Sequence, residues 1–285
     1  MRNDFQTITF SVQDGIGRLT LNRPDRLNGI TNQMMRDLYD VLVELPTLPE
    51  ARVVVLTGEG RGFCPGADLG HYSSGAAEQP LAPEHFQLTA MLHELPQVTV
   101  AAVNGACAGA GLGWAAACDL RYAARSANFN SAFLGVGISG DMAGPWLLPR
   151  IIGASRAREL FLMPGKFSAE EAERIGLVSK VFDDDEFRPE VDAIVARLAA
   201  SAPLAIRAMK QNFIAAENMS LREYIRVETE RHQRTGASEA RAGTAGAGGR
   251  ADGSPDGSDR SATSTAIDGR EAAISAAMAA KSKPR

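Results

Sequence analysis

The chain has 285 residues, enough for a large domain with a substantial buried core. Its 30 Lys and Arg against 34 Asp and Glu give a formal net charge of −4, so it lacks the basic excess with which proteins hold nucleic-acid phosphates. The 3 cysteines have no metal-ligand spacing and leave an odd thiol. We therefore expect a cytoplasmic protein in a reducing setting, with no nucleic-acid partner and no metal site.

The N-terminal residues predict a β-hairpin. Apolar and polar residues alternate over 6–12 and again over 16–21, and Asp14-Gly15 between them is a dipeptide typical of tight hairpin turns. The same segment has neither the apolar core nor the small-residue cleavage site of a signal peptide. We expect the chain to open with two paired strands.

A helix and a buried strand are expected next. Thr31 has the residue type of a helix N-cap, and the residues after it are apolar at helical spacing until Pro46, which cannot continue the helix. The run VVVLTG at 53–58 is apolar and β-branched, as in strands that are buried on both faces. A further helix is predicted over 84–94. This alternation indicates an α/β fold.

The apolar window 98–118 is about as long as a membrane span. However, Asn104-Gly105 is a turn signal, and the residues after it are mostly Gly and Ala, which are too weakly hydrophobic to stabilise a membrane span. We therefore predict no membrane segment, but a strand at 98–103, a Gly-rich loop and a buried helix from about Gly111. A short strand follows at 119–124.

Beyond Asp141 the pattern becomes helical. Ser168 and Glu171 have the spacing of a capping box at the start of one of these helices. After about Thr235 the composition changes to Ala, Gly, Ser, Thr and Asp, which can bury little surface. The sequence therefore predicts a disordered tail over 236–268 and a marginal helix in the last residues. The expected helices before the tail lie at 155–163, 168–176, 190–201, 203–216 and 220–233.

Four segments in order carry a resemblance to a known family. They are NRPDRLNG at 22–29, GRGFCPGADL at 60–69, the Gly-rich stretch at 101–124 and the stretch at 137–181. Together they resemble the crotonase, or enoyl-CoA hydratase/isomerase, superfamily, and the resemblance extends over about residues 5 to 235. No single motif is decisive, but their order and spacing are specific.

The resemblance implies an α/β fold of the crotonase-like (ClpP/crotonase) type, a spiral core of ββα units followed by C-terminal helices. It divides the chain into an acyl-CoA-binding core at 1–187, a helical oligomerisation region at 188–235 and a low-complexity tail at 236–285. Proteins of this superfamily form trimers or dimers of trimers, so self-association is expected. Coenzyme A is expected as part of the substrate, with no separate cofactor.

The Gly-rich loops suit the chemistry of a thioester. Negative charge builds on the thioester oxygen whether such an enzyme hydrates, isomerises or hydrolyses, and two backbone N–H groups stabilise that charge best. Glycines give backbone access that side chains would obstruct, and a helix that begins near Gly111 adds its positive end. By match to the family motif, the two donors are the amides of Ala67 and Ala110.

Further site residues follow from the same match. Asp68 and Leu69 correspond to the family segment beside the adenine of CoA, and Arg26 to a basic residue near its phosphates. Four side chains are expected to shape the acyl pocket. The four are His71, Trp114, Phe133 and Trp146. His71 and its neighbour Tyr72 are also alternative proton carriers.

The sequence departs from the family at its general acid and base. Typical hydratases of the superfamily use two glutamates, and the matching positions here are Gly113 and Phe133, neither of which transfers a proton. Asp141 is the remaining acidic candidate, at a position that resembles the active-site aspartate of some isomerases and dehalogenases of the superfamily. A carboxyl in an apolar pocket has a raised pKa, which suits a base. The alternative role for Asp141 is as a helix N-cap.

We therefore expect an acyl-CoA enzyme that isomerises a double bond, with Asp141 as proton shuttle and an enolate held by the two amides. The alternatives are a hydratase with nonstandard acid and base residues, a thioester hydrolase and a dehalogenase-like enzyme. A protein of a different class, a noncatalytic CoA-binding subunit, is a further alternative, because both glutamates are absent.

Overall fold

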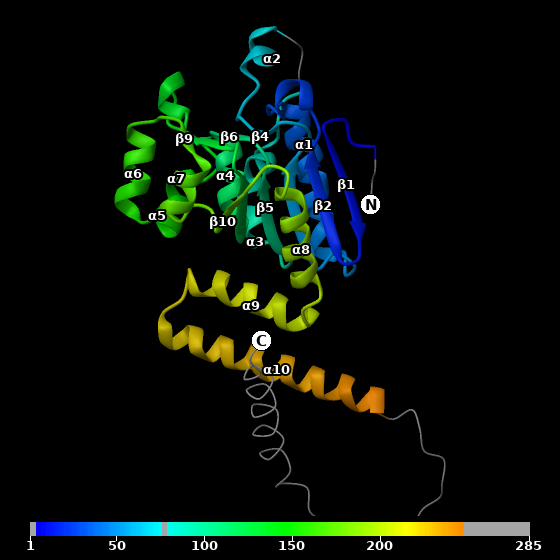
Figure 1. The fold of residues 1–285 in the computed structure, drawn as a ribbon. Coiled ribbons are helices and arrows are strands. Elements are labelled where there is room, and N and C mark those ends of the chain that lie inside the picture. The colour runs from blue at the N-terminus through cyan, green and yellow to red at the C-terminus, as the bar shows by residue number, and fades with distance from the viewer. Residues whose placement is uncertain (1–3, 76–78, 248–285) are drawn as a thin grey trace, which may run out of the picture. The chain divides into compact units, whose positions relative to one another are not determined.

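The chain opens with a paired hairpin, as predicted. The computed structural model describes residues 4–75 and 79–247 (Figure 1). Strands β1 (Ile8–Gln13) and β2 (Ile16–Leu21) pair antiparallel, and the turn between them has positive φ at both Asp14 (54°) and Gly15 (83°). Two successive positive φ values match the turns that Asp-Gly favours. The hairpin forms one edge of the main sheet.

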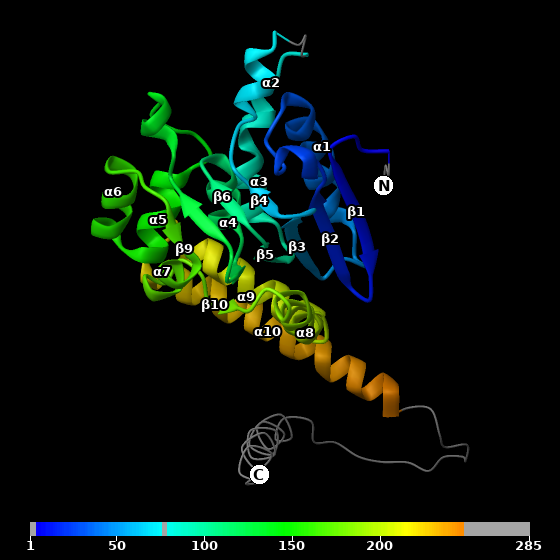
Figure 2. The same cartoon turned by 45° about the horizontal axis from the view of Figure 1, so that its top comes forward.

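Two sheets make up the β structure. The main sheet has the strand order β1-β2-β3-β5-β7-β10, and every pair after the hairpin is parallel. A second sheet of short strands has the order β4-β6-β8-β9 and lies beside it (Figure 2). The remaining strands are β3 (Val53–Gly58), β4 (Gly62–Cys64), β5 (Val98–Val103), β6 (Ala106–Ala108), β7 (Leu120–Ala124), β8 (Asn128–Asn130), β9 (Phe167–Ser168) and β10 (Lys180–Phe182).

The strands alternate between the sheets in repeating units. A long strand of the main sheet is followed by a short strand of the second sheet and then by helical structure: β3 and β4 precede α2 (Leu69–Ser73), β5 and β6 precede α4 (Ala110–Ala117), and β7 and β8 precede η4 (Phe133–Val136). Because parallel neighbours require a crossover each time, the chain winds as a spiral. This confirms the predicted α/β class with ββα units and C-terminal helices.

Both faces of the main sheet are buried. In β3, Val54 and Leu56 join the core cluster that contains α1 (Asn32–Glu44) and α4, whereas Val53 and Val55 join the cluster under α8 (Phe187–Ala199). Alternate side chains of a strand point to opposite faces, so an unbroken apolar run is what a doubly covered strand requires. The predicted two-sided burial of 53–58 is confirmed.

The first long helix begins and ends where the sequence predicts. The Thr31 hydroxyl accepts a hydrogen bond from the Met34 amide at 3.3 Å, and α1 ends at Glu44, just before Pro46. A short 3-10 turn, η2 (Leu45–Thr47), follows. The predicted helix over 84–94 divides into a 3-10 turn, η3 (Pro83–Gln87), and α3 (Leu88–Glu94).

The apolar window is part of the core. Residues 98–118 form β5, β6 and α4, and all eight residues of α4 are buried. Among the helices in residues 4–75 and 79–247, none combines the length and the hydropathy needed to cross a membrane. The strand and the buried helix in this window are as predicted, whereas the predicted loop contains a further short strand, β6.

The C-terminal part is helical. Ser168 accepts from the Glu171 amide at 3.2 Å, whereas the Glu171 carboxylate binds Arg174 (2.6 Å), so the Ser168 cap is present and Glu171 turns to a different partner. The N-terminal part, by contrast, has a short 3-10 turn, η1 (Pro24–Arg26), between β2 and α1. The helices after the last Gly-rich loop are α5 (Gly144–Ile152), α6 (Ala154–Leu162), α7 (Ala169–Arg174), α8, α9 (Pro203–Ala216) and α10 (Leu221–Ala247).

Helix α10 extends beyond the predicted boundary. It continues through 236–247, a range predicted to be disordered, while the compact unit of the fold ends at Ala237. The physical reason is that Ala has the highest helix propensity and an existing helix supplies the nucleus from which such a segment propagates. The rest of the predicted tail and its marginal helix, 248–285, lie outside the described residues.

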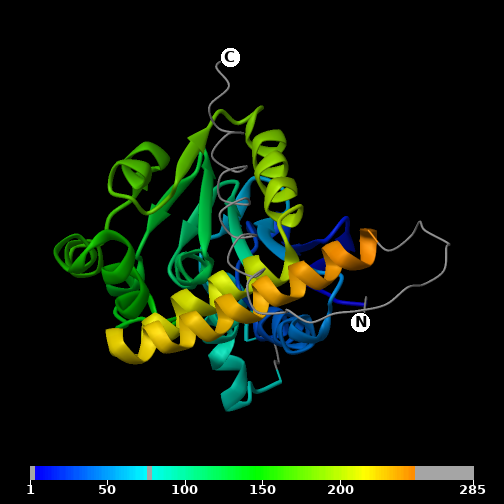
Figure 3. The same cartoon turned by 90° about the horizontal axis from the view of Figure 1, so that it is seen from below.

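A buried ion pair attaches α9 to the main sheet. The Lys210 ammonium lies 2.9 Å from the Asp119 carboxylate and donates to the Gln97 carbonyl at 2.9 Å. The start of α10 runs beside α9, where Arg231 donates to the Gln211 carbonyl (Figure 3). Separating the two side chains would leave a buried charged group without its partner, which is costly, so this contact fixes where α9 docks.

Candidate active site

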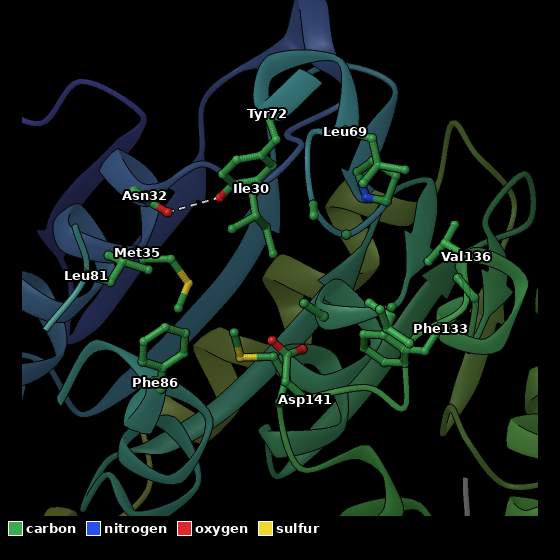
Figure 4. A pocket seen from close by; sticks show the side chains of 18 residues that line it. Ile30, Asn32, Met35, Leu69, Tyr72, Leu81, Phe86, Phe133, Val136 and Asp141 are labelled. Carbon is green, nitrogen blue, oxygen red and sulfur yellow. Dashed lines mark hydrogen bonds between the residues drawn. The ribbon is translucent and has the colours of Figure 1, made fainter. Parts of the chain in front are cut away.

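A cavity of about 290 Å³ lies between the Gly-rich loops that follow β4 and β6. Its walls are mostly apolar, and the carboxylate of Asp141 points into it from one side (Figure 4). The side chains of Asn32 and Tyr72 bring further polar atoms to another wall. The apolar lining includes Ile30, Met35, Leu69, Leu81, Phe86, Phe133, Val136 and Ile138.

The first loop turns the Ala67 amide toward this cavity. Ile30 and Ala67 form a parallel bridge, in which Ile30 donates to the Gly66 carbonyl (2.9 Å) and Asp68 donates to the Ile30 carbonyl (3.0 Å). In a parallel bridge the flanking residues make the hydrogen bonds, so the N–H of Ala67 itself points away from Ile30. Gly66 reaches this turn with φ of +98°, which favours glycine.

The second loop presents the Ala110 amide. Ala110 is the first residue of α4, so its N–H belongs to the helix N-terminus and has no partner within the helix. Within the described part of the chain, neither the Ala110 nor the Ala67 amide donates to a protein acceptor. The loops also approach closely, since a Cβ built on Gly66 would lie 3.7 Å from the Ala110 nitrogen. Both donors line one cavity, as the oxyanion hypothesis requires.

Asp141 is free of the capping role. Helix α5 begins at Gly144 with Ala143 as its N-cap, and no side chain caps it. The N-cap alternative for Asp141 is therefore wrong, because the left-handed turn at Met142 and Ala143 separates the carboxylate from the helix start. Desolvation by the apolar surroundings raises the pKa of Asp141, although its own backbone N–H opposes the shift. A raised pKa brings the carboxyl closer to useful base strength.

Gly113 and Phe133, which match the glutamate positions of typical hydratases, both have packing roles in this structure. Phe133 is a wall of the cavity. Gly113 lies directly under the neighbouring loop, because a Cβ built on it would be 2.5 Å from the Met142 carbonyl oxygen. A glutamate at position 113 would need the loop that carries Asp141 to move. Among the described residues that line the cavity, Asp141 is the one with a carboxylate side chain.

Three predicted pocket residues lie elsewhere. Trp114 is 1% exposed and packs in the core among leucines of α1 and α3. On α4 it is one residue beyond Gly113, about 100° around the helix, so it faces away from the cavity. Trp146 stacks on the Arg150 guanidinium (3.8 Å) on the outer side of α5, where it contacts His93. His71 also lies outside the lining.

Tyr72, the neighbour of His71, does line the cavity. Its hydroxyl donates to Asn32 Oδ1 at 3.2 Å (Figure 4). Sequence reasoning missed Asn32, together with Ile30 and Met35 from the same segment. The bridge between Ile30 and Ala67 brings this segment to the cavity, and no local motif announces such a pairing.

The cysteine in the first loop is a packing residue. Cys64 is fully buried, and burial raises the pKa of its thiol to about 12, with a hydrogen bond from Gly66 opposing the shift. A thiol that stays protonated is a poor nucleophile. No group of three or more His, Cys, Asp or Glu among the described residues could hold a metal ion.

The predicted CoA side of the loop contains an ion pair. Asp68 caps α2 by accepting from the His71 amide (3.0 Å), and its carboxylate pairs with Arg23 at 2.9 Å. Burial alone would raise the pKa of Asp68, but the His71 amide and the Arg23 charge outweigh it and hold that pKa below its ordinary value, with a smaller contribution from exposed Arg26. Arg23 is the direct partner of Asp68, whereas the placement of Arg26 near the CoA phosphates stays a prediction.

Replacing that partner gives a pH-dependent prediction. We expect Arg23→Gln to lower the free energy of unfolding at pH 7 by about 2 kcal/mol, the scale of a hydrogen bond to a charged group. Because the folded pKa of Asp68 is lowered, the pair stabilises above the ordinary Asp pKa of about 3.9 and loses its effect as pH falls through the folded value. Urea unfolding at pH 7 and pH 3 measures this. An equal loss of unfolding free energy at both pH values would contradict the assigned Arg23–Asp68 ion pair.

Comparisons with known proteins find similar sequences and structures. A profile of the enoyl-CoA hydratase/isomerase family matches residues 11–247. A protein named "Probable enoyl-CoA hydratase" from Rhodobacter capsulatus is 39% identical over 74% of this chain and 82% of its own. The 1,2-epoxyphenylacetyl-CoA isomerase of Escherichia coli is 35% identical over 80% of this chain and 89% of its own. The crystal structure of an enoyl-CoA hydratase from Bacillus anthracis superposes with a TM-score of 0.74 at 29% identity, covering 80% of this chain and 90% of that one.

Proposed function

Because the chain belongs to the enoyl-CoA hydratase/isomerase family and so acts on CoA thioesters, we propose that it isomerises a carbon–carbon double bond of an acyl-CoA. The observation that carries this proposal is the set of polar groups around the cavity. One carboxylate, Asp141, faces two backbone donors, and the two positions that hold glutamates in hydratases are a glycine and a phenylalanine. One proton carrier suffices to move a proton between two carbons.

The proposed steps use these groups in turn. The thioester carbonyl oxygen accepts hydrogen bonds from the Ala67 and Ala110 amides, and the Asp141 carboxylate removes a proton from the carbon next to that carbonyl. The electron pair of the C–H bond forms an enolate whose negative oxygen the amides stabilise. The enolate then conjugates with the old double bond and takes the proton back from Asp141 two carbons further along. No water and no net charge is added.

The experiment is a panel of 2-enoyl, 3-enoyl and aromatic CoA thioesters followed by mass spectrometry. We expect unchanged mass with a shifted double bond for a 3-enoyl substrate. A gain of the mass of one water would establish hydration instead, and release of free CoA would establish hydrolysis. Binding of acetyl-CoA without turnover of any thioester would identify a noncatalytic subunit. We propose no cofactor besides the CoA of the substrate, and a cytoplasmic location, which the three buried free cysteines support.

We also propose that the protein assembles as a trimer or a dimer of trimers through residues 188–235. Supporting this, α9 and the start of α10 expose large apolar side chains, which on a monomer would face water. They are Leu204, Met209, Phe213, Leu221 and Ile225.

Truncation tests the boundary of that interface. Removal of all residues after Ala237, where the compact unit ends, is expected to leave the number of subunits unchanged, because the exposed apolar side chains lie before it. Light scattering measures the molar mass. Dissociation to monomers after truncation would show that the interface requires the removed segment.

A further inference from the structure

The carboxylate of Asp141 is positioned through its neighbour. Among the described residues, no side chain donates a hydrogen bond to it, and its one hydrogen-bond donor is its own backbone N–H, so the local backbone, with the turn at Met142 and Ala143, sets its direction. Both of these residues have φ of 55°, in the left-handed region. That conformation costs a non-glycine residue about 1–2 kcal/mol, so other contacts must hold the turn in place.

One such contact is made by the backbone of Met142. Its carbonyl oxygen and Cβ pack on α4 at Gly113, where a Cβ would come within 2.5 Å and 2.7 Å of these atoms. Because Gly113 has no side chain, the turn at Met142 can pack directly against α4. Met142 is 8% exposed, so this contact is shielded from water.

The second contact is made by the side chain of Met142. The Thr89 hydroxyl, on α3, donates to Met142 Sδ at 3.4 Å. Thr89 is 3% exposed and does not line the cavity. A thioether is a weak acceptor, so this bond adds modestly to stability but fixes a flexible side chain in one place.

We propose that Thr89 is a positioning residue for Asp141: its hydroxyl holds Met142 against Gly113, and the clamped turn keeps the Asp141 carboxylate pointed into the cavity. This inference rests on the proposed function, in which Asp141 moves the proton. Met142 lines the cavity and is held between α3 and α4, so a change at Thr89, which lies outside the lining, reaches the carboxylate through Met142.

The test is Thr89→Val, which keeps the shape and removes the hydroxyl. We expect kcat to fall by about 10-fold or more, since small misplacements of a reacting group act on that scale, while KM stays unchanged. Thr89→Ser keeps a hydroxyl and should restore most of the rate. A loosened carboxylate meets more water, so the pH at which kcat declines on the acid side should move down.

A matched control separates positioning from general loosening of the core. Thr7 also buries a hydroxyl, which donates to Asp37 Oδ2 at 2.7 Å away from the cavity. Thr7→Val should lower the melting temperature and leave kcat and the pH profile as in the parent protein. An equal loss of kcat in Thr7→Val and Thr89→Val would overturn the positioning role, as would an unchanged kcat in Thr89→Val.

A second measurement keeps this test distinct from that of the proposed function. The Asp141 carboxyl can be titrated by ¹³C NMR in the parent protein and in Thr89→Val. If Asp141→Asn retains full activity, the proposed function fails, while a lowered Asp141 pKa in Thr89→Val would still establish the clamp. If Asp141→Asn is inactive and Thr89→Val changes neither rate nor titration, only the clamp fails.

Discussion

Asp141→Asn is expected to lower kcat by at least about 100-fold, because proton transfer by a positioned side chain contributes 10²–10⁴-fold and an amide cannot replace it. KM for the acyl-CoA and the melting temperature should change little. The side chain keeps its size, and Asp141 caps no helix whose start the substitution could disturb. Steady-state kinetics on the 3-enoyl substrate, with thermal unfolding alongside, measures both effects.

The pH dependence of kcat provides a second test of the role of Asp141. Desolvation raises the pKa of Asp141, and the base form is the unprotonated one, so activity should decline as pH falls through that raised pKa. In Asp141→Asn the residual rate should lose this acid limb. Asp14→Asn, a change of another aspartate in the hairpin turn, serves as the control and should keep both the rate and the limb. Full activity in Asp141→Asn would remove Asp141 from the mechanism.

Ala110→Pro is expected to reduce kcat by about 10²–10³-fold, the usual effect of losing one oxyanion donor. Proline replaces the N–H hydrogen that the mechanism uses with a ring carbon, so the donor is lost. Ala110 is the first residue of α4, where proline is well tolerated because that N–H has no partner inside the helix. The fold should therefore survive, which circular dichroism and thermal unfolding can verify.

The matched control for this variant is Ala110→Gly, which keeps the N–H. It should retain most of the rate, although added backbone freedom will lower stability somewhat. Electron density of a bound acyl-CoA provides an independent check. A thioester oxygen beyond hydrogen-bond distance from both Ala67 and Ala110, or an active Ala110→Pro variant, would contradict the assigned oxyanion hole.

Much of the fold follows from local physics. The hairpin around Asp14-Gly15, the Thr31 cap and the doubly buried strand at 53–58 each depend on residues near one another in sequence, so their patterns predicted them correctly. The Gly-rich loops were likewise recognisable, because positive φ at Gly66 and Gly109 requires glycine or nearly so. The choice of Ala67, Ala110 and Asp141 within the chain came from the resemblance to the family, and all three residues line one cavity.

The direction in which a side chain points was decided only in three dimensions. Trp114 and Gly113 are adjacent on α4, but packing against α1 and α3 buries the tryptophan in the core and leaves the glycine beside the Asp141 loop. Ile30 reaches the cavity through its bridge to Ala67, 37 residues away in number. The sequence offered Asp141 as a helix N-cap or as a proton shuttle, and the left-handed turn at Met142 and Ala143 excludes the N-cap. The sequence by itself determined the hairpin, the long strands and most of the helices, since those depend on nearby residues, whereas contacts between distant segments formed the second sheet of short strands and decided which side chains share the cavity.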